Sequence, residues 1–192
     1  MKTAEQIGLE LLTSVRQLSR EVDEVYTRLV LPTWMSELHG LPAALYGYML
    51  GVFARIDLAS AYWRGGDAGN QTERMVGFME AYLGQPSDLC AVAVQMWRHK
   101  LIHTAQPRPL RHPTTGFVYR WLLHWGEHLP EPQHFTLSES GEMRVLNLGL
   151  VYLIADLQRG LELFVEAAAR DSAIQANMVR YERNLCNQTL RL

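Results

Sequence analysis

Apolar residues recur every three or four positions over residues 3–30, which is the spacing of one face of an α-helix. The stripe consists of Ile7, Leu11, Val15, Leu18, Val22, Val25 and Leu29. Pro32 lacks a backbone donor, so we expect the helix to end before it. A second apolar stretch begins near Pro42 and continues to Trp63, where the glycines at 65–66 interrupt it. Two long helices are therefore predicted.

Further helical patterns follow along the chain. Asn70 or Thr72 can cap a third helix, which Gly84 closes, and a fourth runs from about residue 87 to 104. After an interruption, a stripe with helical spacing returns and ends near residue 170; it consists of Leu150, Leu153, Leu157, Leu161, Phe164 and Ala168. A short polar helix is expected from Ala173.

Residues 107–148 have a different pattern. Prolines and Gly116 break the beginning of this segment into a loop. Residues 117–125 are aromatic and branched, which favours a strand and leaves a helix possible, whereas HFTLS and MRVLNL flank the turn-like ESGE and predict a hairpin. We therefore expect a mainly α protein, a single domain over residues 1–192. Its fold would be an up-and-down helical bundle with a small antiparallel β insertion near residues 117–148.

Composition narrows the class of protein. The chain has 18 Lys and Arg against 20 Asp and Glu, so bulk positive charge cannot hold nucleic acid or membrane. Cys90 and Cys186 lie far apart, which argues against a disulfide scaffold or a paired-cysteine zinc site. The beginning of the chain lacks the apolar core of a signal peptide. We expect a cytoplasmic protein that does not contact a membrane.

The near-neutral total charge conceals a basic segment. The 38 residues from 89 to 126 contain no Asp or Glu. Their five cations are Arg98, Lys100, Arg108, Arg111 and Arg120. Such a surface favours an anion, phosphate above others, and we take Lys100, Arg108 and Arg111 as candidates for binding RNA or another phosphate-bearing ligand.

The fourth helix gathers polar groups on one side. At about 100° per residue, His99 and His103 fall on the same arc as Gln95, next to Arg98. The opposite side is apolar and carries Cys90, Val94, Trp97 and Leu101. A simply solvated face would more often carry Glu and Lys than His and Gln.

Within this helix, residues 98–103 read RHKLIH, an Arg followed by four residues and a His. The segment resembles the signature of the HEPN superfamily, helical bundles that include many RNA-cleaving proteins of bacterial defence and toxin-antitoxin systems. In that family a polar residue commonly follows the Arg, and His99 occupies this position. The resemblance covers the motif, its place near the end of a helix and the helical setting. It does not extend to the proline-rich loop and the sheet after His103.

The resemblance implies metal-independent RNA cleavage, in which the 2′-hydroxyl of the substrate attacks the adjacent phosphorus. His103 would act as general acid or base, and Arg98 would stabilise charge on the phosphorane. His99 would orient the pair or bind the phosphate. Asp57 is the candidate for an acidic residue that many members carry on a preceding helix. The family also implies a homodimer with a shared cleft. No metal or other cofactor is expected.

Three alternatives remain open at this level. Arg98 can instead form a structural bridge with Asp57. His99 and His103 are spaced to bind one metal from a single helix face, although the neighbouring cations Arg98 and Lys100 oppose this. The chain can also be a non-catalytic nucleotide-binding or partner-binding module, one half of a two-component system of the toxin-antitoxin kind.

Overall fold

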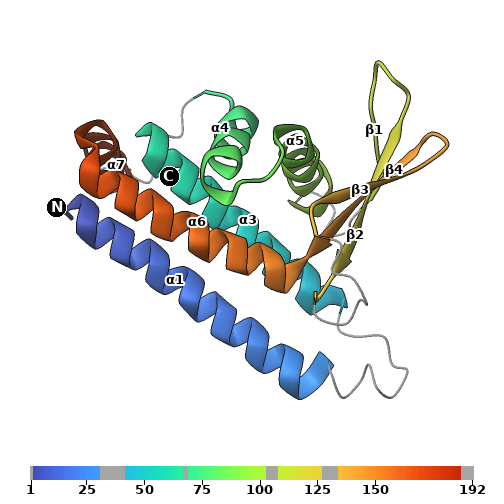
Figure 1. Ribbon diagram of the computed structural model, residues 1–192, viewed down its shortest axis with the longest axis horizontal. Helices are drawn as coiled ribbons and strands as arrows, with labels where there is room; N and C mark the ends of the chain where they lie inside the picture. Colours follow the sequence, from blue (N-terminus) through green and yellow to red (C-terminus); the bar gives the residue numbers. More distant parts are fainter. Residues whose placement is uncertain (1, 31–41, 67–68, 103–107, 127–133, 187–192) are drawn as a thin grey trace, which may run out of the picture.

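A computed structural model describes residues 2–30, 42–66, 69–102, 108–126 and 134–186, and for residues 42–43 and 99–101 it describes the backbone alone. Most of these residues are helical (Figure 1). The helices are α1 (Ala4–Val25), α3 (Pro42–Arg64), α4 (Gln71–Phe78), α5 (Ser87–Met96), α6 (Leu150–Arg170) and α7 (Ser172–Cys186). The π-helical turns η1 (Tyr26–Val30), η2 (Met79–Leu83) and η3 (Trp97–Ile102) extend α1, α4 and α5. The expectation of a mainly α protein with a small sheet is confirmed.

The apolar stripes predict most of the helical core. All six stripe residues of α6 are buried, as are the first five of α1. The α1 stripe fails at its end, where Leu29 is 49% exposed and Tyr26 and Val30 are buried instead. The π-helical turn η1 causes this change, because its wider winding rotates the following side chains away from the α-helical register.

The sheet differs from the expected antiparallel insertion. Its strands are β1 (Leu110–Arg111), β2 (Val118–His124), β3 (Thr136–Ser140) and β4 (Met143–Gly149), in the order β1-β2-β4-β3. The predicted hairpin of β3 and β4 is present, but β2 and β4 pair in parallel, so the sheet is mixed. The apolar strands β2 and β4 occupy the centre, and the short polar strand β3 takes an edge, where its outward side chains meet water.

Aromatic stacking holds the sheet and η3 on the helices. The ring of Phe53, on α3, stacks between Trp97 of η3 and Trp121 of β2, with centroid distances of 5.7 and 5.8 Å. All three side chains are buried. This stack fixes where the end of the α5–η3 helix lies relative to the sheet.

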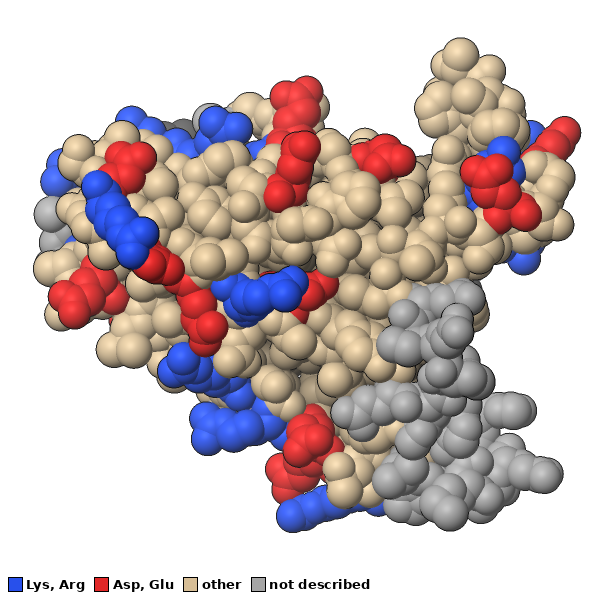
Figure 2. Space-filling model, viewed as in Figure 1, with Lys and Arg blue, Asp and Glu red and all other residues tan. Residues whose placement is uncertain are grey.

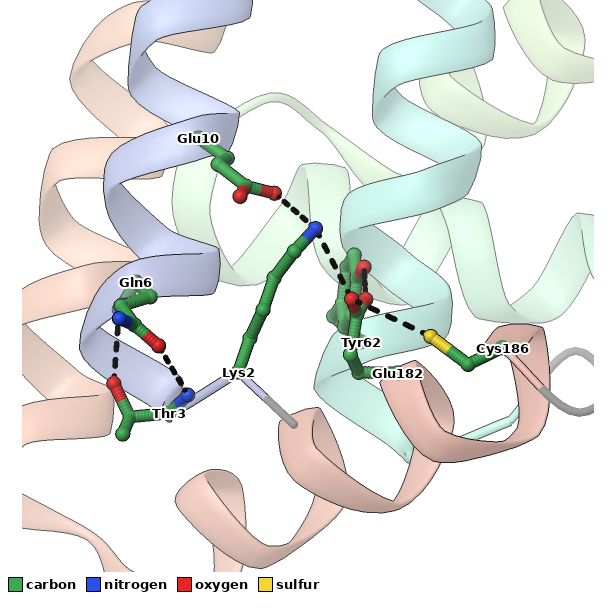
Figure 3. A network of polar contacts seen from close by, with 7 residues as sticks. All are labelled: Lys2, Thr3, Gln6, Glu10, Tyr62, Glu182 and Cys186. Carbon is green, nitrogen blue, oxygen red and sulfur yellow. Dashed lines mark hydrogen bonds and ion pairs between the residues drawn. The ribbon is translucent and has the colours of Figure 1, made fainter.

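A polar network joins the N-terminal segment to α3 and α7 at the end of the helices that lies away from the sheet (Figure 1 and Figure 3). Glu182 of α7 is 5% exposed and accepts a 2.5 Å hydrogen bond from the hydroxyl of Tyr62 on α3. The ammonium of Lys2 lies 3.1 Å from Glu182 and 2.6 Å from Glu10 of α1. The buried carboxylate of α7 thus contacts α3 directly and is linked to α1 through Lys2, which precedes that helix.

Candidate functional site

A cleft of about 660 Å³ lies between α5 and the sheet, at the end of the molecule where the two elements stand next to each other (Figure 1). We refer to it as the α5–sheet cleft. Its helical wall consists of Asp88, Leu89, Ala91, Val92 and Gln95; its other wall consists of Leu110, Arg111, His112, Pro113, Tyr119 and Leu137. The volume lies within the range of roughly 300–1,000 Å³ that is typical of ligand pockets.

The helical wall follows from the two-sided pattern of α5. Cys90, Val94 and Trp97 are buried, as the predicted apolar side requires. Val92 and Gln95 are half-buried and line the cleft from the other side, which is the arc on which the sequence places Gln95. The cleft is therefore bordered by the polar arc of the fourth helix and not by its apolar stripe.

The apolar residues of the sheet wall lie on one face of the sheet, as the alternation of side chains along the strands requires. Leu110 and Tyr119 are paired across β1 and β2, so their side chains share one face of the sheet. Leu137 of β3 lies on the same face, because it pairs with Leu146 of β4, which in turn pairs with Trp121. The lining is mainly apolar, and the exposed polar residues Asp88, Arg111 and His112 form its rim.

The cationic part of the rim is held by a tight turn. The Arg111 guanidinium donates a 2.9 Å hydrogen bond to the carbonyl of Gly116, whose φ of 73° favours glycine. His112 Nδ1 accepts hydrogen bonds from the backbone amides of Thr114 and Thr115 at 3.3 and 3.2 Å. In the neutral imidazole the proton therefore lies on Nε2, which leaves that nitrogen free to donate to a ligand oxygen.

Arg98 lies just beyond the helical wall. Gln95 is the last residue of α5 to line the cleft, and Arg98 follows three positions later on η3, half-buried. Residues three apart on a helix are neighbours on its surface. η3 has π-helical winding, as do η1 and η2, which lie outside the cleft.

Of the other predicted site residues, some lie at or near the cleft and some have side chains that the structure does not describe. Arg111 lines the cleft, and Arg108 is exposed two residues before β1. His99 and Lys100 belong to η3, but their side chains lie outside the described part of the chain, as does the whole of His103. The meeting of Arg98 with His103 therefore stays a prediction.

The side chain of Asp57, on α3, contacts two side chains of α4. Its carboxylate lies 2.5 Å from the guanidinium of Arg74 and accepts a 2.8 Å hydrogen bond from Gln71. Arg74 is 7% exposed and also donates to Ser60. Within the described residues, Asp57 forms a structural ion pair with Arg74 and not with Arg98.

The sequence did not single out His112, Tyr119 or Leu137 as site residues. Alternation along a strand can place Tyr119 on one face, but only the packing of α5 against that face turns it into the wall of a cleft.

Surface charge, potential metal ligands and helix hydropathy bear on the functions that the sequence leaves open. The face in Figure 2 carries interleaved cationic and anionic side chains, without a broad field of one sign. In the described part of the chain, no group of three or more His, Cys, Asp or Glu side chains is arranged to hold a metal ion. The same part contains no helix that is long and apolar enough to cross a membrane.

Comparison with known proteins adds no relative. No family model, curated protein or solved structure matches the chain. The candidate site is therefore argued from its own geometry.

Proposed function

We propose that this protein is an RNA-directed, HEPN-like protein that holds unpaired RNA at the α5–sheet cleft and cleaves it with Arg98 and His103, without a metal. The observation that carries the proposal is the position of Arg98. It lies one helical turn beyond a ligand-sized cleft whose opposite rim presents Arg111 and His112. An extended phosphodiester could then contact cations on both sides of the cleft.

The shape and chemistry of the cleft fit an unpaired nucleotide. A base has two apolar faces, which match the aliphatic wall of α5 and the ring of Tyr119, and a polar edge, which matches Gln95. The phosphate would accept hydrogen bonds from Arg111 and His112 at the rim. Lys100 and Arg108 are further candidates for phosphate contacts along the same strand.

The proposed reaction forms a bond between the 2′-oxygen and phosphorus and breaks the bond between phosphorus and the 5′-oxygen. One group removes the 2′-hydroxyl proton and another protonates the leaving 5′-oxygen; His103 performs one of these two proton transfers, and water performs the other. Arg98 stabilises the charge on the equatorial oxygens, with His99 beside it.

The proposal also includes the assembly and the setting of the protein. The helices would form an up-and-down bundle, and two copies would pair so that their Arg98 motifs share one cleft. A reducing cytoplasm suits the two free thiols, Cys90 and Cys186.

The decisive experiment incubates the protein with mixed RNA in the presence of a chelator. Wild type should cleave, and Arg98→Ala and His103→Ala should each lose cleavage. Arg170→Ala is the matched control, because it removes an exposed arginine that pairs with Glu166 far along α6. Equal cleavage by all four proteins would refute the assignment of the catalytic pair.

A binding measurement examines the cleft separately from the chemistry. Tyr119→Ala should weaken the binding of a short unstructured RNA by about tenfold, since stacking on an aromatic ring contributes roughly 1–3 kcal/mol per base. Arg170→Ala should leave the affinity unchanged. Unaltered binding by Tyr119→Ala would place the RNA elsewhere.

One observation favours a second candidate function. The walls of the cleft are mainly apolar, as in grooves that accept a helix of a partner protein. The protein would then be the non-catalytic module of a two-component system. Failure to bind or cleave RNA, together with a stable complex with one defined partner that is lost in Val92→Glu, would support this candidate.

A further inference from the structure

A polar cluster outside the proposed site joins the segments that lead into α5 and β3, two of the elements that border the α5–sheet cleft. At its centre is the carboxylate of Asp156 on α6, whose side chain is 16% exposed. Gln85 Nε2 donates to Asp156 Oδ2 at 2.7 Å, and His134 Nε2 lies 3.1 Å from the same oxygen. Arg159 contacts the other oxygen, Oδ1, at 3.1 Å.

The orientation of His134 is determined on both of its ring nitrogens. Its Nδ1 accepts a 3.2 Å hydrogen bond from the backbone amide of Gly149, at the junction of β4 and α6. The neutral ring therefore carries its proton on Nε2 and donates it to Asp156. With a side chain only 12% exposed, His134 is anchored to α6 through two separate contacts.

The backbone next to His134 has an unfavourable conformation at Phe135. Phe135 has a φ of 50°, in the left-handed region that a bulky residue rarely adopts. It is held there by burial of its ring and by a 2.9 Å hydrogen bond from its amide to the carbonyl of Asn147. Strain of this kind persists only where the surroundings over-determine the conformation.

The positions of the two contacts along the chain connect them to the cleft. Gln85 precedes by three residues Asp88, the first cleft-lining residue of α5. His134 precedes by three residues Leu137, which lines the cleft from β3. The segment that leads into α5 and the segment that leads into β3, the strand that supplies Leu137 to the sheet wall, are thus both joined by hydrogen bonds to one oxygen atom of α6.

We propose that Asp156 is a positioning residue that holds both walls of the α5–sheet cleft in register, and thereby keeps the cleft open at a fixed width for its ligand. The part of this proposal that concerns the ligand rests on the proposed function. The part that concerns the walls does not, because it follows from the shared Oδ2 contact alone.

Because Gln85 and His134 contact the same oxygen of Asp156, two substitutions of this residue can separate the role of that oxygen from the role of the charge. Asp156→Leu keeps the branching and the number of side-chain heavy atoms and removes the hydrogen bonds to Gln85 and His134. Asp156→Asn keeps one carbonyl oxygen, which can accept from Gln85 and His134 together, and loses the contact with the exposed Arg159. Arg159→Gln is the control for that loss. The conservative variant should therefore rescue what Asp156→Leu disrupts.

Hydrogen exchange of the full-length protein measures the walls directly. Asp156→Leu should accelerate amide exchange at least about tenfold in peptides covering residues 86–92 and 134–140, as expected for loss of hydrogen bonds to a charged group. Gln85→Leu should affect only the first peptide, and His134→Leu only the second. Asp156→Asn and Arg159→Gln should stay within about threefold of wild type.

Several results would overturn the inference. One is Asp156→Leu exchange that changes at one wall only, or equally over the whole chain. Another is failure of Asp156→Asn to restore both peptides. If Asp156→Leu does not fold, the wall-specific effects of Gln85→Leu and His134→Leu decide the matter, because acceleration of both peptides by either variant contradicts separate contacts.

A short unstructured RNA then serves as the probe of the cleft. Asp156→Leu should weaken its binding about fivefold or more, and Asp156→Asn should bind as wild type does. If wild type does not bind the RNA, the proposed function fails while the exchange results still decide whether Asp156 positions the walls. If the RNA binds Asp156→Leu as tightly as wild type although both walls exchange faster, the positioning role for the ligand is refuted.

Discussion

Replacing Tyr62 with Phe should destabilise the fold by about 2 kcal/mol. The change removes only a hydroxyl, which donates a 2.5 Å hydrogen bond to a carboxylate that is 5% exposed. Hydrogen bonds to charged groups contribute roughly 1.5–3 kcal/mol, and Glu182 would retain its ion pair with Lys2 and the long 4.0 Å contact with the Cys186 thiol. The ring of Phe can keep the edge-on packing that Tyr62 makes with Tyr181 at a centroid distance of 5.2 Å. The cost is therefore assigned to the lost hydrogen bond.

Urea unfolding at neutral pH measures this free energy, and the thermal midpoint should fall by about 4–8 °C for a chain of this size. A double-mutant cycle with Glu182→Gln isolates the interaction, because the effects of two changes in contact are not additive. Loss of less than about 0.5 kcal/mol in Tyr62→Phe, or full additivity in the cycle, would show that the buried carboxylate does not depend on the hydroxyl.

The same pair predicts an acid-dependent loss of stability. The hydrogen bond from Tyr62, assisted by Lys2 and opposed by burial, lowers the pKa of Glu182 below its ordinary value of 4.5. A carboxylate whose pKa is lower in the folded state stabilises the fold above the unfolded pKa. This contribution is lost as the pH falls from about 4.5 through the folded pKa. Unfolding free energies measured between pH 7 and pH 3 should therefore decline more steeply for wild type than for Glu182→Gln, and parallel curves would contradict this account.

Further changes test the packing and the reactivity of other elements. Gly160→Ala should lower stability by about 1–3 kcal/mol, since its Cβ would lie 2.9 Å from a backbone oxygen of η2. Gly47→Ala, whose Cβ would have no atom of the described residues within 4 Å, should instead raise stability by about 0.5–1 kcal/mol in thermal unfolding. Arg180→Gln should cost about 1–2 kcal/mol, because its guanidinium donates hydrogen bonds at 3.1 and 3.0 Å to the carbonyls of Arg64, the last residue of α3, and of Gly65, which follows it. Burial raises the pKa of the Cys90 thiol to about 12, so a thiol reagent should label only Cys186 until denaturant is added, as mass spectrometry can verify.

The helices could be predicted from the sequence because their information is local. Stripe residues such as Leu153 and Phe164 recur at the period of the helix, so their common burial follows from the direction of each side chain. Asn70 likewise accepts hydrogen bonds from the amides of Thr72 and Glu73, as its predicted role as a cap requires. The register of the α1 stripe failed at its end, where Val25 is half-buried and Leu29 is exposed in the π-helical turn that follows α1.

The candidate site was only partly predictable. The polar arc of the fourth helix identified Gln95 as distinct from the buried Cys90, and the basic segment included Arg111. The partner of Asp57 could not be predicted, because it depends on how α4 packs against α3. There Arg74 reaches it from another helix and forms a 2.5 Å ion pair.

The sequence by itself determined where most helices begin and end, which of their faces are buried, and that cations gather between residues 89 and 126. These properties depend on neighbours within a few residues. Only the tertiary structure decided that β4 pairs with β2 in parallel and that α5 stands opposite the sheet to enclose a cleft. It alone also brings Gln85 and His134 to one oxygen of Asp156. Those outcomes depend on contacts between segments far apart in the chain, whose residue types alone do not specify which partner each will meet.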